Sequence, residues 1–238
     1  MAEVDERTAA RLARKKRRQE RRRRQLLDAA RDLVVEGGMA ALTMAALAER
    51  ADTSASTLYY YLPGRDAVVD ALAADLVDLE TERLMEALEN SEGGVESLCA
   101  VMDARVRMYI DEPKRFGVLY LRLVGTSISP DTLRERIYPA SAKTMGELER
   151  RLRADKEAGL VHPDLKPREF ANVGFFATQG ILATSLGMQA SGGTMRFPVH
   201  VLLEEAKAMV RRAARVEFPM AAKPSHAAGG AETNIEVK

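Results

Sequence analysis

The sequence predicts an all-α protein, with an N-terminal three-helix helix-turn-helix domain followed by a larger helical domain. Hydrophobic residues recur at spacings of three and four along most of the chain, which is the period of a helix face. Alternating patterns typical of strands are not evident between its turn dipeptides. Hydrophobic residues make up 46% of the 238 positions, enough for a sizeable core.

Residues 1–24 are expected to form a flexible basic arm. Between Arg11 and Arg24, ten of fourteen residues are Lys or Arg, and Glu20 is the only acid. Such a run is typical of a solvated, mobile tail that keeps a protein in solution. Its position before a helix-turn-helix favours the other interpretation, an extension that follows phosphates or enters a minor groove. The arm residues nearest the next domain are Arg22, Arg23 and Arg24.

Residues 25–70 contain the two short helices of a helix-turn-helix. Thr43 is placed to cap a first helix, Met44–Ala51, because a threonine hydroxyl accepts a hydrogen bond from the first helical turn. Ser54 is placed to cap a second helix, Ala55–Tyr61, in the same way. A helix this short is marginal alone. We therefore expect Leu58, its only aliphatic residue of any size, to brace it against the core.

Three consecutive tyrosines, Tyr59, Tyr60 and Tyr61, are expected to face outward from the second helix. Adjacent helical residues point about 100° apart, so at least one ring of the three must be exposed, whereas ordinary packing is the competing interpretation for the others. Together with Ser54, Ser56 and Thr57 they form a surface of hydroxyl groups without acids. Such a surface suits phosphate oxygens and base edges in the major groove of duplex DNA.

Residues 71–218 are expected to form the larger domain, and residues 219–238 a disordered tail. Glycine and proline divide it into helices. The first begins at Pro63-Gly64-Arg65-Asp66 and runs to about Asn90. The others are expected at Val95–Asp111, Pro113–Thr126, Asp131–Ala158 with an interruption at Tyr138-Pro139, Pro167–Met188 and Phe197–Val216.

The last two helices carry a stripe of small residues and an apolar seam that would suit a four-helix dimer bundle. An ordinary intramolecular core has the same periodicity. A symmetric pair of helix-turn-helix units reads two half-sites, which favours the dimer. The candidate interface residues are Phe176, Ala177, Gly180, Thr184, Gly187, Val199, Leu202, Ala206 and Met209.

One stretch resembles a known family. The run T-M-A-A-L-A-E-R-A-D-T-S-A-S-T-L-Y-Y-Y-L-P-G-R-D-A-V-V, after a helix ending E-G-G, is similar to the DNA-binding region of TetR-family transcriptional repressors over roughly Gln25 to Asp70. The sequence departs from that pattern at Thr53, Ala55, Ser56, Leu62 and Arg65. The resemblance implies that Thr43, Ser54, Ser56, Thr57, Tyr59, Tyr60, Tyr61 and Arg65 approach DNA, with Tyr59, Tyr61 and Arg65 mainly holding phosphates.

The resemblance also implies a homodimer held by the C-terminal helices, a palindromic operator in double-stranded DNA, and a small effector that releases the operator. Met-rich and aromatic walls would suit a hydrophobic effector, and Arg105 or Arg122 would meet an anionic group, although both are more often surface residues. The default interpretation of the wall residues is a plain core. The candidate pocket residues are Cys99, Met102, Arg105, Val106, Tyr109, Phe116, Tyr120, Leu123 and Met145.

Charge is distributed unevenly along the chain. The net charge is +1, yet residues 11–65 hold 13 basic and 6 acidic residues, so a footprint for nucleic acid lies at one end. The polar start and the lack of a run of eighteen apolar residues favour a cytoplasmic protein without membrane contact. The single cysteine, Cys99, is expected to be a buried small hydrophobe.

An enzyme is not expected. His162, His200 and His226 are far apart, and neither a metal-ligand spacing, a nucleophile elbow nor a phosphate-binding loop occurs. We expect no metal and no cofactor. The alternative to a regulator is a constitutive architectural protein that binds DNA through the basic arm without ligand control, and sequence-specific binding distinguishes the two.

Overall fold

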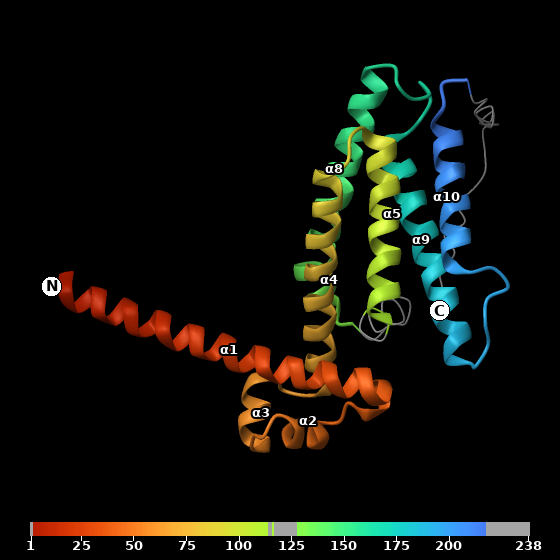
Figure 1. Ribbon diagram of the computed structural model, residues 1–238. Helices are drawn as coiled ribbons and strands as arrows, with labels where there is room; N and C mark the ends of the chain where they lie inside the picture. The colour runs from red at the N-terminus through yellow and green to blue at the C-terminus, as the bar shows by residue number, and fades with distance from the viewer. Residues whose placement is uncertain (1, 114–115, 117–127, 218–238) are drawn as a thin grey trace, which may run out of the picture.

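The computed structural model describes residues 2–113, 116 and 128–217, and within these residues every regular element is helical (Figure 1). Expected helix bounds agree with the observed ones to within two residues, except for the segment 113–126, which lies almost wholly outside the described residues. The elements are α1 (Ala2–Ala41), α2 (Met44–Arg50), α3 (Ala55–Tyr61), α4 (Arg65–Glu89), α5 (Gly94–Asp111), α7 (Pro130–Thr132), the π-helical turn η1 (Leu133–Ile137), α8 (Tyr138–Glu157), α9 (Pro167–Ala190) and α10 (Val199–Ala214).

The N-terminal head consists of α2, α3 and the second half of α1, packed against the start of α4. Leu26, Leu47 and Leu58 are fully buried in one apolar cluster that also takes Val68 and Leu72 from α4. Leu58 is the expected brace of α3. Because α3 has only seven residues, this contact supplies most of what holds it helical.

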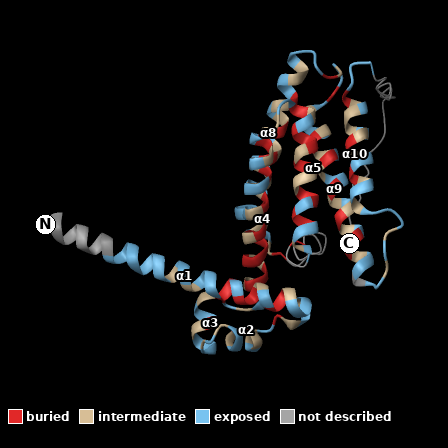
Figure 2. Cartoon of the chain, in the orientation of Figure 1, coloured by how far each residue is buried: buried red, intermediate tan, exposed pale blue. Residues whose placement is uncertain are grey.

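The C-terminal bundle consists of α4, α5, α8, α9 and α10, which surround a second apolar cluster. It takes Leu76, Leu84 and Leu88 from α4, so this helix belongs to both cores. Figure 1 shows α4 rising from the head into the bundle, and Figure 2 shows buried residues along it. A movement of α4 in the bundle therefore has to move the head.

The predicted interruption at Pro139 takes the form of a π-helical turn, η1. Proline has no N–H to donate to the carbonyl four residues earlier. The preceding turn widens, and the N–H of Tyr138 donates to the carbonyl of Leu133, five residues back. The short helix before it is capped by the Ser129 hydroxyl, which accepts from the N–H of Thr132 at 3.2 Å.

The basic arm differs from its expected form. Residues 2–24 continue α1 as helix and project beyond the head, as Figure 1 shows. Gly38 has a left-handed φ of 70° near the other end of α1, a conformation that glycine adopts without steric cost. The tail at 219–238 lies outside the described residues.

Candidate nucleic-acid interface

Two hydroxyl caps set the ends of the helix-turn-helix. The N–H of Ala46 donates to Thr43 Oγ1 at 3.1 Å, and the N–H of Thr57 donates to Ser54 Oγ at 3.2 Å. Both caps confirm the sequence prediction. Each cap satisfies a helix N–H that otherwise has no partner within the helix, and is worth about 1 kcal/mol.

The start of α3 presents a small group of linked hydroxyls. Ser54 Oγ donates to Thr57 Oγ1 at 2.9 Å and lies 3.1 Å from Ser56 Oγ. Ser54 and Ser56 are exposed and Thr57 is half-buried. With no acid on α3, these groups and the N-terminal N–H groups of the helix offer donors to an anion without like-charge repulsion.

The three tyrosines do not share one environment. Tyr59 is 49% exposed and Tyr60 is 69% exposed, but Tyr61 is half-buried against the head core. The expectation that all three face outward is therefore wrong for Tyr61, because a 100° turn per residue carries the third ring toward the core. The rings of Tyr60 and Tyr61 meet edge to face, with centroids 5.0 Å apart.

Arg65 is bound to the head rather than left free. Its Nε donates to the carbonyl of Leu42 at 2.9 Å, and a terminal nitrogen donates to the carbonyl of Met39 at 2.9 Å. The side chain thus closes the end of α1 with a two-donor fork. The resemblance assigned Arg65 to phosphate, and the structure adds a role that no local pattern signalled, because its acceptors lie 23 and 26 residues away.

Two contacts attach the arm to the helix-turn-helix. Gln19 Nε2 donates to the hydroxyl of Tyr60 at 3.1 Å, and an Arg22 guanidinium nitrogen lies 3.5 Å from the carbonyl of Ala51. Arg22 is half-buried, whereas Arg23 and Arg24 are exposed. Sequence reasoning missed Gln19. Its signal was a neutral amide within an otherwise basic run.

Charged pairs join the helices of the head to each other. Arg50 on α2 binds both carboxylate oxygens of Glu36 on α1, at 3.0 and 2.6 Å, and this carboxylate raises the pKa of Arg50. Arg31 on α1 lies 3.6 Å from Asp75 on α4. Burial raises the pKa of Asp75, partly offset by Arg31. These pairs link α2 and α4 to α1.

The candidate pocket residues that the structure describes are packed into the bundle core. Met102, Val106, Tyr109 and Phe116 are buried in one cluster, with Met145 packed against it, and Cys99 is buried as well but is not part of that cluster. Burial raises the pKa of the Cys99 thiol to about 11, as suits a small hydrophobe. Two further candidates, Tyr120 and Leu123, lie outside the described residues, as does Arg122.

Arg105 was expected to meet an anionic group of the effector, but in the structure its guanidinium group is bound by acceptors of the bundle itself. It is 1% exposed, and its Nε donates to Glu80 Oε1 at 2.9 Å. Its terminal nitrogens donate to the carbonyl of Phe175 at 2.9 Å and to Gln179 Oε1 at 2.5 Å. A buried charge requires such partners. The network joins α4 and α5 to α9.

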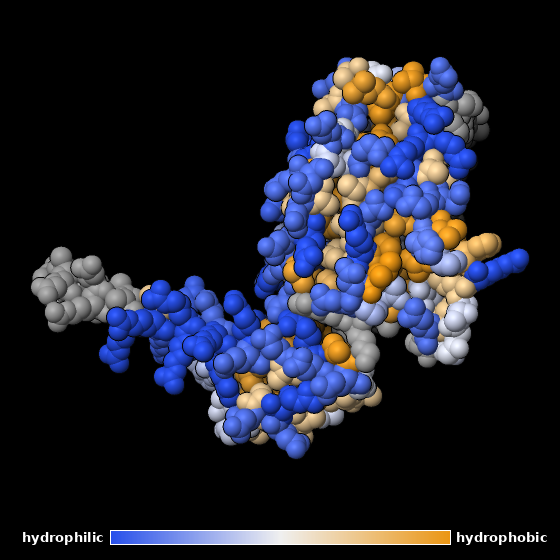
Figure 3. All heavy atoms as spheres, viewed as in Figure 1, coloured by the Kyte–Doolittle hydropathy of each residue, from blue (hydrophilic) through white to orange (hydrophobic). Residues whose placement is uncertain are grey.

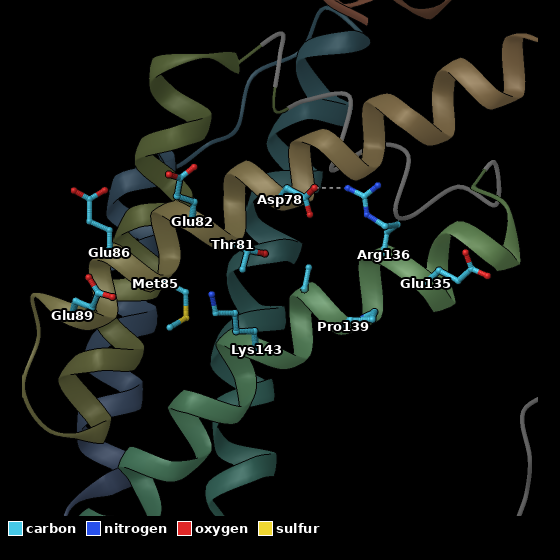
Figure 4. A pocket seen from close by; sticks show the side chains of 11 residues that line it. Asp78, Thr81, Glu82, Met85, Glu86, Glu89, Glu135, Arg136, Pro139 and Lys143 are labelled. Carbon is cyan, nitrogen blue, oxygen red and sulfur yellow. Dashed lines mark hydrogen bonds and ion pairs between the residues drawn. The ribbon is translucent and has the colours of Figure 1, made fainter. Parts of the chain in front are cut away.

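Two open clefts flank α4, and neither is lined by a candidate pocket residue. One, of about 840 Å³, lies between α4 and η1–α8 (Figure 4), with Thr81, Met85 and Lys143 reaching toward it and the Asp78–Arg136 ion pair at 2.5 Å on its rim. The other, of about 380 Å³, lies between α4 and α5. Both are shallow and strongly charged, unlike an apolar ligand pocket.

The candidate interface residues divide into two groups. Phe176, at 62% exposed, lies on an outward face of α9 with Ala177, Gly180 and Thr184, and Met209 is exposed on α10. In contrast, Val199 and Ala206 pack against the bundle core, and Leu202 and Gly187 are half-buried. The seam expected on α10 is therefore partly intramolecular, because one face of that helix covers the core.

Among the described residues, no group of three His, Cys, Asp or Glu side chains is placed to hold a metal ion. In the same part of the chain, no helix is long and apolar enough to cross a membrane. His162 Nδ1 accepts from the N–H of Asp164 at 3.1 Å in a surface loop.

Comparisons with known proteins agree with this geometry. Residues 26–72 match the model of the bacterial regulatory proteins of the tetR family, a segment that covers the head from α1 to the start of α4. A search of curated proteins returned no match.

Solved structures share the fold of about four fifths of the chain. The fatty acid degradation regulator FadR from Bacillus halodurans is 15% identical with a TM-score of 0.62, over 79% of this chain and 94% of that one. FadR from Bacillus subtilis, in complex with stearoyl-CoA, is 16% identical with a TM-score of 0.64, over 80% and 98%. AibR, in complex with isovaleryl coenzyme A and operator DNA, is 19% identical with a TM-score of 0.58, over 79% and 97%. These likenesses show the fold, and the matched segment shows that the head is a domain of the type found in the bacterial regulatory proteins of the tetR family.

Proposed function

We propose that this regulator is a homodimeric repressor that binds a palindromic operator through α3 and is released by a small hydrophobic effector. The observation that carries the proposal is the capped, acid-free surface of α3, with Tyr59 and Tyr60 exposed beside Ser54 and Ser56. Hydroxyls and a helix N-terminus suit phosphate and base edges, and a short braced helix fits the major groove.

The dimer proposal is supported by the outward face of α9. Phe176 is exposed there, and a Cβ added at Gly180 would meet, among the described residues, no atom within 4 Å other than those of its own helical turn. Exposed aromatic and small residues on one helix face suit close approach of a second helix. Two copies joined at α9 would present two copies of α3 to two half-sites.

The effector proposal is supported by the helix that both cores share. An effector that fits one arrangement of α4 better than the other shifts the head by its differential affinity. The acyl-CoA complexes of the FadR and AibR neighbours support a hydrophobic effector here as well. The described candidate residues form a closed core, so effector binding would have to open it or use residues beyond those described.

A selection of genomic fragments on the purified protein tests DNA recognition. Fragments are recovered in the presence of excess random DNA, and a repressor should enrich a few palindromic sites by several orders of magnitude. If random DNA abolishes every preferred site, the protein is a constitutive architectural binder. Compounds are then titrated against the recovered site, starting with acyl-CoA thioesters of different chain length.

The dimer is tested by placing a bulky side chain on the open face of α9. Gly180→Leu should leave helicity unchanged, since the chain leaves room for it, but should halve the mass in sedimentation and abolish operator binding. Gly146→Leu, at an equally open and exposed position on α8, is the matched control and should remain dimeric. A dimer that tolerates Gly180→Leu would place the interface elsewhere.

A further inference from the structure

The arm is densely basic, and most of its charged side chains are exposed. Ten of the fourteen residues between Arg11 and Arg24 are basic, and of these Arg22 is half-buried while the others are exposed. Figure 3 shows the arm as a hydrophilic projection clear of the bundle. Pairs such as Arg14 and Arg18, or Arg17 and Arg21, stand four residues apart, where like charges destabilise a helix. A bound polyanion would remove this repulsion between like charges and so stabilise the helical arm.

The contacts of Gln19 and Arg22 with the head determine where this polyanion would lie. The Gln19–Tyr60 hydrogen bond ties the arm to the exposed end of α3, and Arg22 ties it to the turn before α3. Gln19 therefore lies on the side of α1 that faces the head. By the 100° helical step, Lys15 and Lys16 lie within about 60° of Gln19, on the same side but one turn farther out. They are thus directed toward whatever α3 binds.

The length of the arm sets its reach. With a rise of 1.5 Å per residue, Arg11 lies about 12 Å beyond Gln19 and the start of α1 about 25 Å beyond it. Along B-DNA, 12 Å corresponds to roughly three to four base pairs. The basic side chains between Arg11 and Gln19 would therefore lie past the base pairs read by α3, along the outer backbone, whereas residues 2–10 hold three acids and one arginine.

We propose that the arm is a helical extension that binds the phosphate backbone of the duplex flanking each half-site. The proposal rests on the proposed operator binding and adds a second contact region outside it. Lysine and arginine on phosphate add affinity and salt dependence without sequence preference. The link through Tyr60 would set the angle of the arm, so that binding of α3 brings the arm onto the flank.

The test compares two variants that each lose two positive charges. Lys15→Gln with Lys16→Gln removes arm charges and keeps good helix formers. Arg168→Gln with Arg212→Gln removes two exposed charges from the bundle and is the matched control. Affinity is measured between 50 and 200 mM salt on the duplex recovered by the selection, first with long flanks and then with flanks trimmed to the half-sites.

On the duplex with long flanks, raising the salt from 50 to 200 mM should weaken the arm variant roughly tenfold less than it weakens the wild type. The reason is that each phosphate contact adds about 0.9 to the slope of log affinity against log salt concentration, and the variant lacks two such contacts. The control should follow the wild type. Trimming the flanks should weaken the wild type and leave the arm variant nearly unchanged. Equal slopes in all three proteins on a specifically bound duplex would overturn the proposal while leaving the repressor intact.

Two other outcomes are distinguishable. If the genomic selection recovers no preferred duplex, the proposed function as a sequence-specific repressor is itself wrong. If the arm charges change binding to vesicles containing phosphatidylserine but not the DNA salt slope, the arm is a lipid-binding segment and the proposal is wrong.

Discussion

Arg65 offers the sharpest test of how the head is built, because the family resemblance and the structure assign it different tasks. A phosphate contact needs positive charge, which lysine also supplies. The observed fork needs two donors at fixed separation, one for the carbonyl of Leu42 and one for that of Met39, both at 2.9 Å. Lysine is a single point donor and does not reproduce this geometry.

The expected magnitude follows from these two bonds. A hydrogen bond to a charged group contributes about 1.5–3 kcal/mol when shielded, and less where water competes. Because Arg65 is exposed, we expect the pair to stabilise the protein by about 2 kcal/mol in total. Arg65→Ala should lower the free energy of unfolding by about 2 kcal/mol, and Arg65→Lys by about 1 kcal/mol.

The assay is urea unfolding followed by circular dichroism, with operator affinity measured in parallel. The denaturation midpoint should fall in the order wild type, Arg65→Lys, Arg65→Ala, with an unchanged dependence on urea. Arg168→Ala, at an exposed position on α9, is the control and should unfold like the wild type. If Arg65→Lys keeps full stability and only Arg65→Ala loses DNA affinity, then Arg65 serves as a charge and the structural reasoning fails.

Three further predictions concern the bundle and the reading surface. Gly94→Ala should destabilise the protein by about 1–3 kcal/mol in urea unfolding, because a Cβ there would lie 2.5 Å from backbone atoms of Leu152. Gly146→Ala, in open space within α8, should instead be neutral or stabilising by up to about 1 kcal/mol, and equal effects at both sites would disprove the close helix contact. Tyr59→Phe should weaken operator binding by about 1 kcal/mol without changing the dimer, whereas unchanged affinity would remove its hydroxyl from the interface. Cys99, buried and with a pKa of about 11, should react with a thiol reagent at pH 8 only as fast as the protein unfolds; rapid labelling of folded protein would contradict its burial.

Features that depend on neighbouring residues were predictable from the sequence. Thr43 and Ser54 cap their helices through bonds to N–H groups three residues ahead, and Leu58 is buried because α3 has no other large aliphatic residue. The interruption before Pro139 follows from its missing N–H. Such contacts are decided within one or two turns, so a local pattern carries the information.

The environments of several functional candidates were decided only by tertiary structure. Arg65 and Arg105 carry the same charge, yet one closes the end of α1 at the surface and the other is buried among partners on α4 and α9. Those partners lie 23 to 74 residues away in sequence. Tyr61 is turned inward against the head core, and the arm is helical, with its Gln19 bonded to Tyr60. From residue 25 onward, the sequence by itself determined which described segments are helical and where they end. The packing of distant segments determined which side chains remain free to bind, because burial and pairing depend on the other helices that meet at each position.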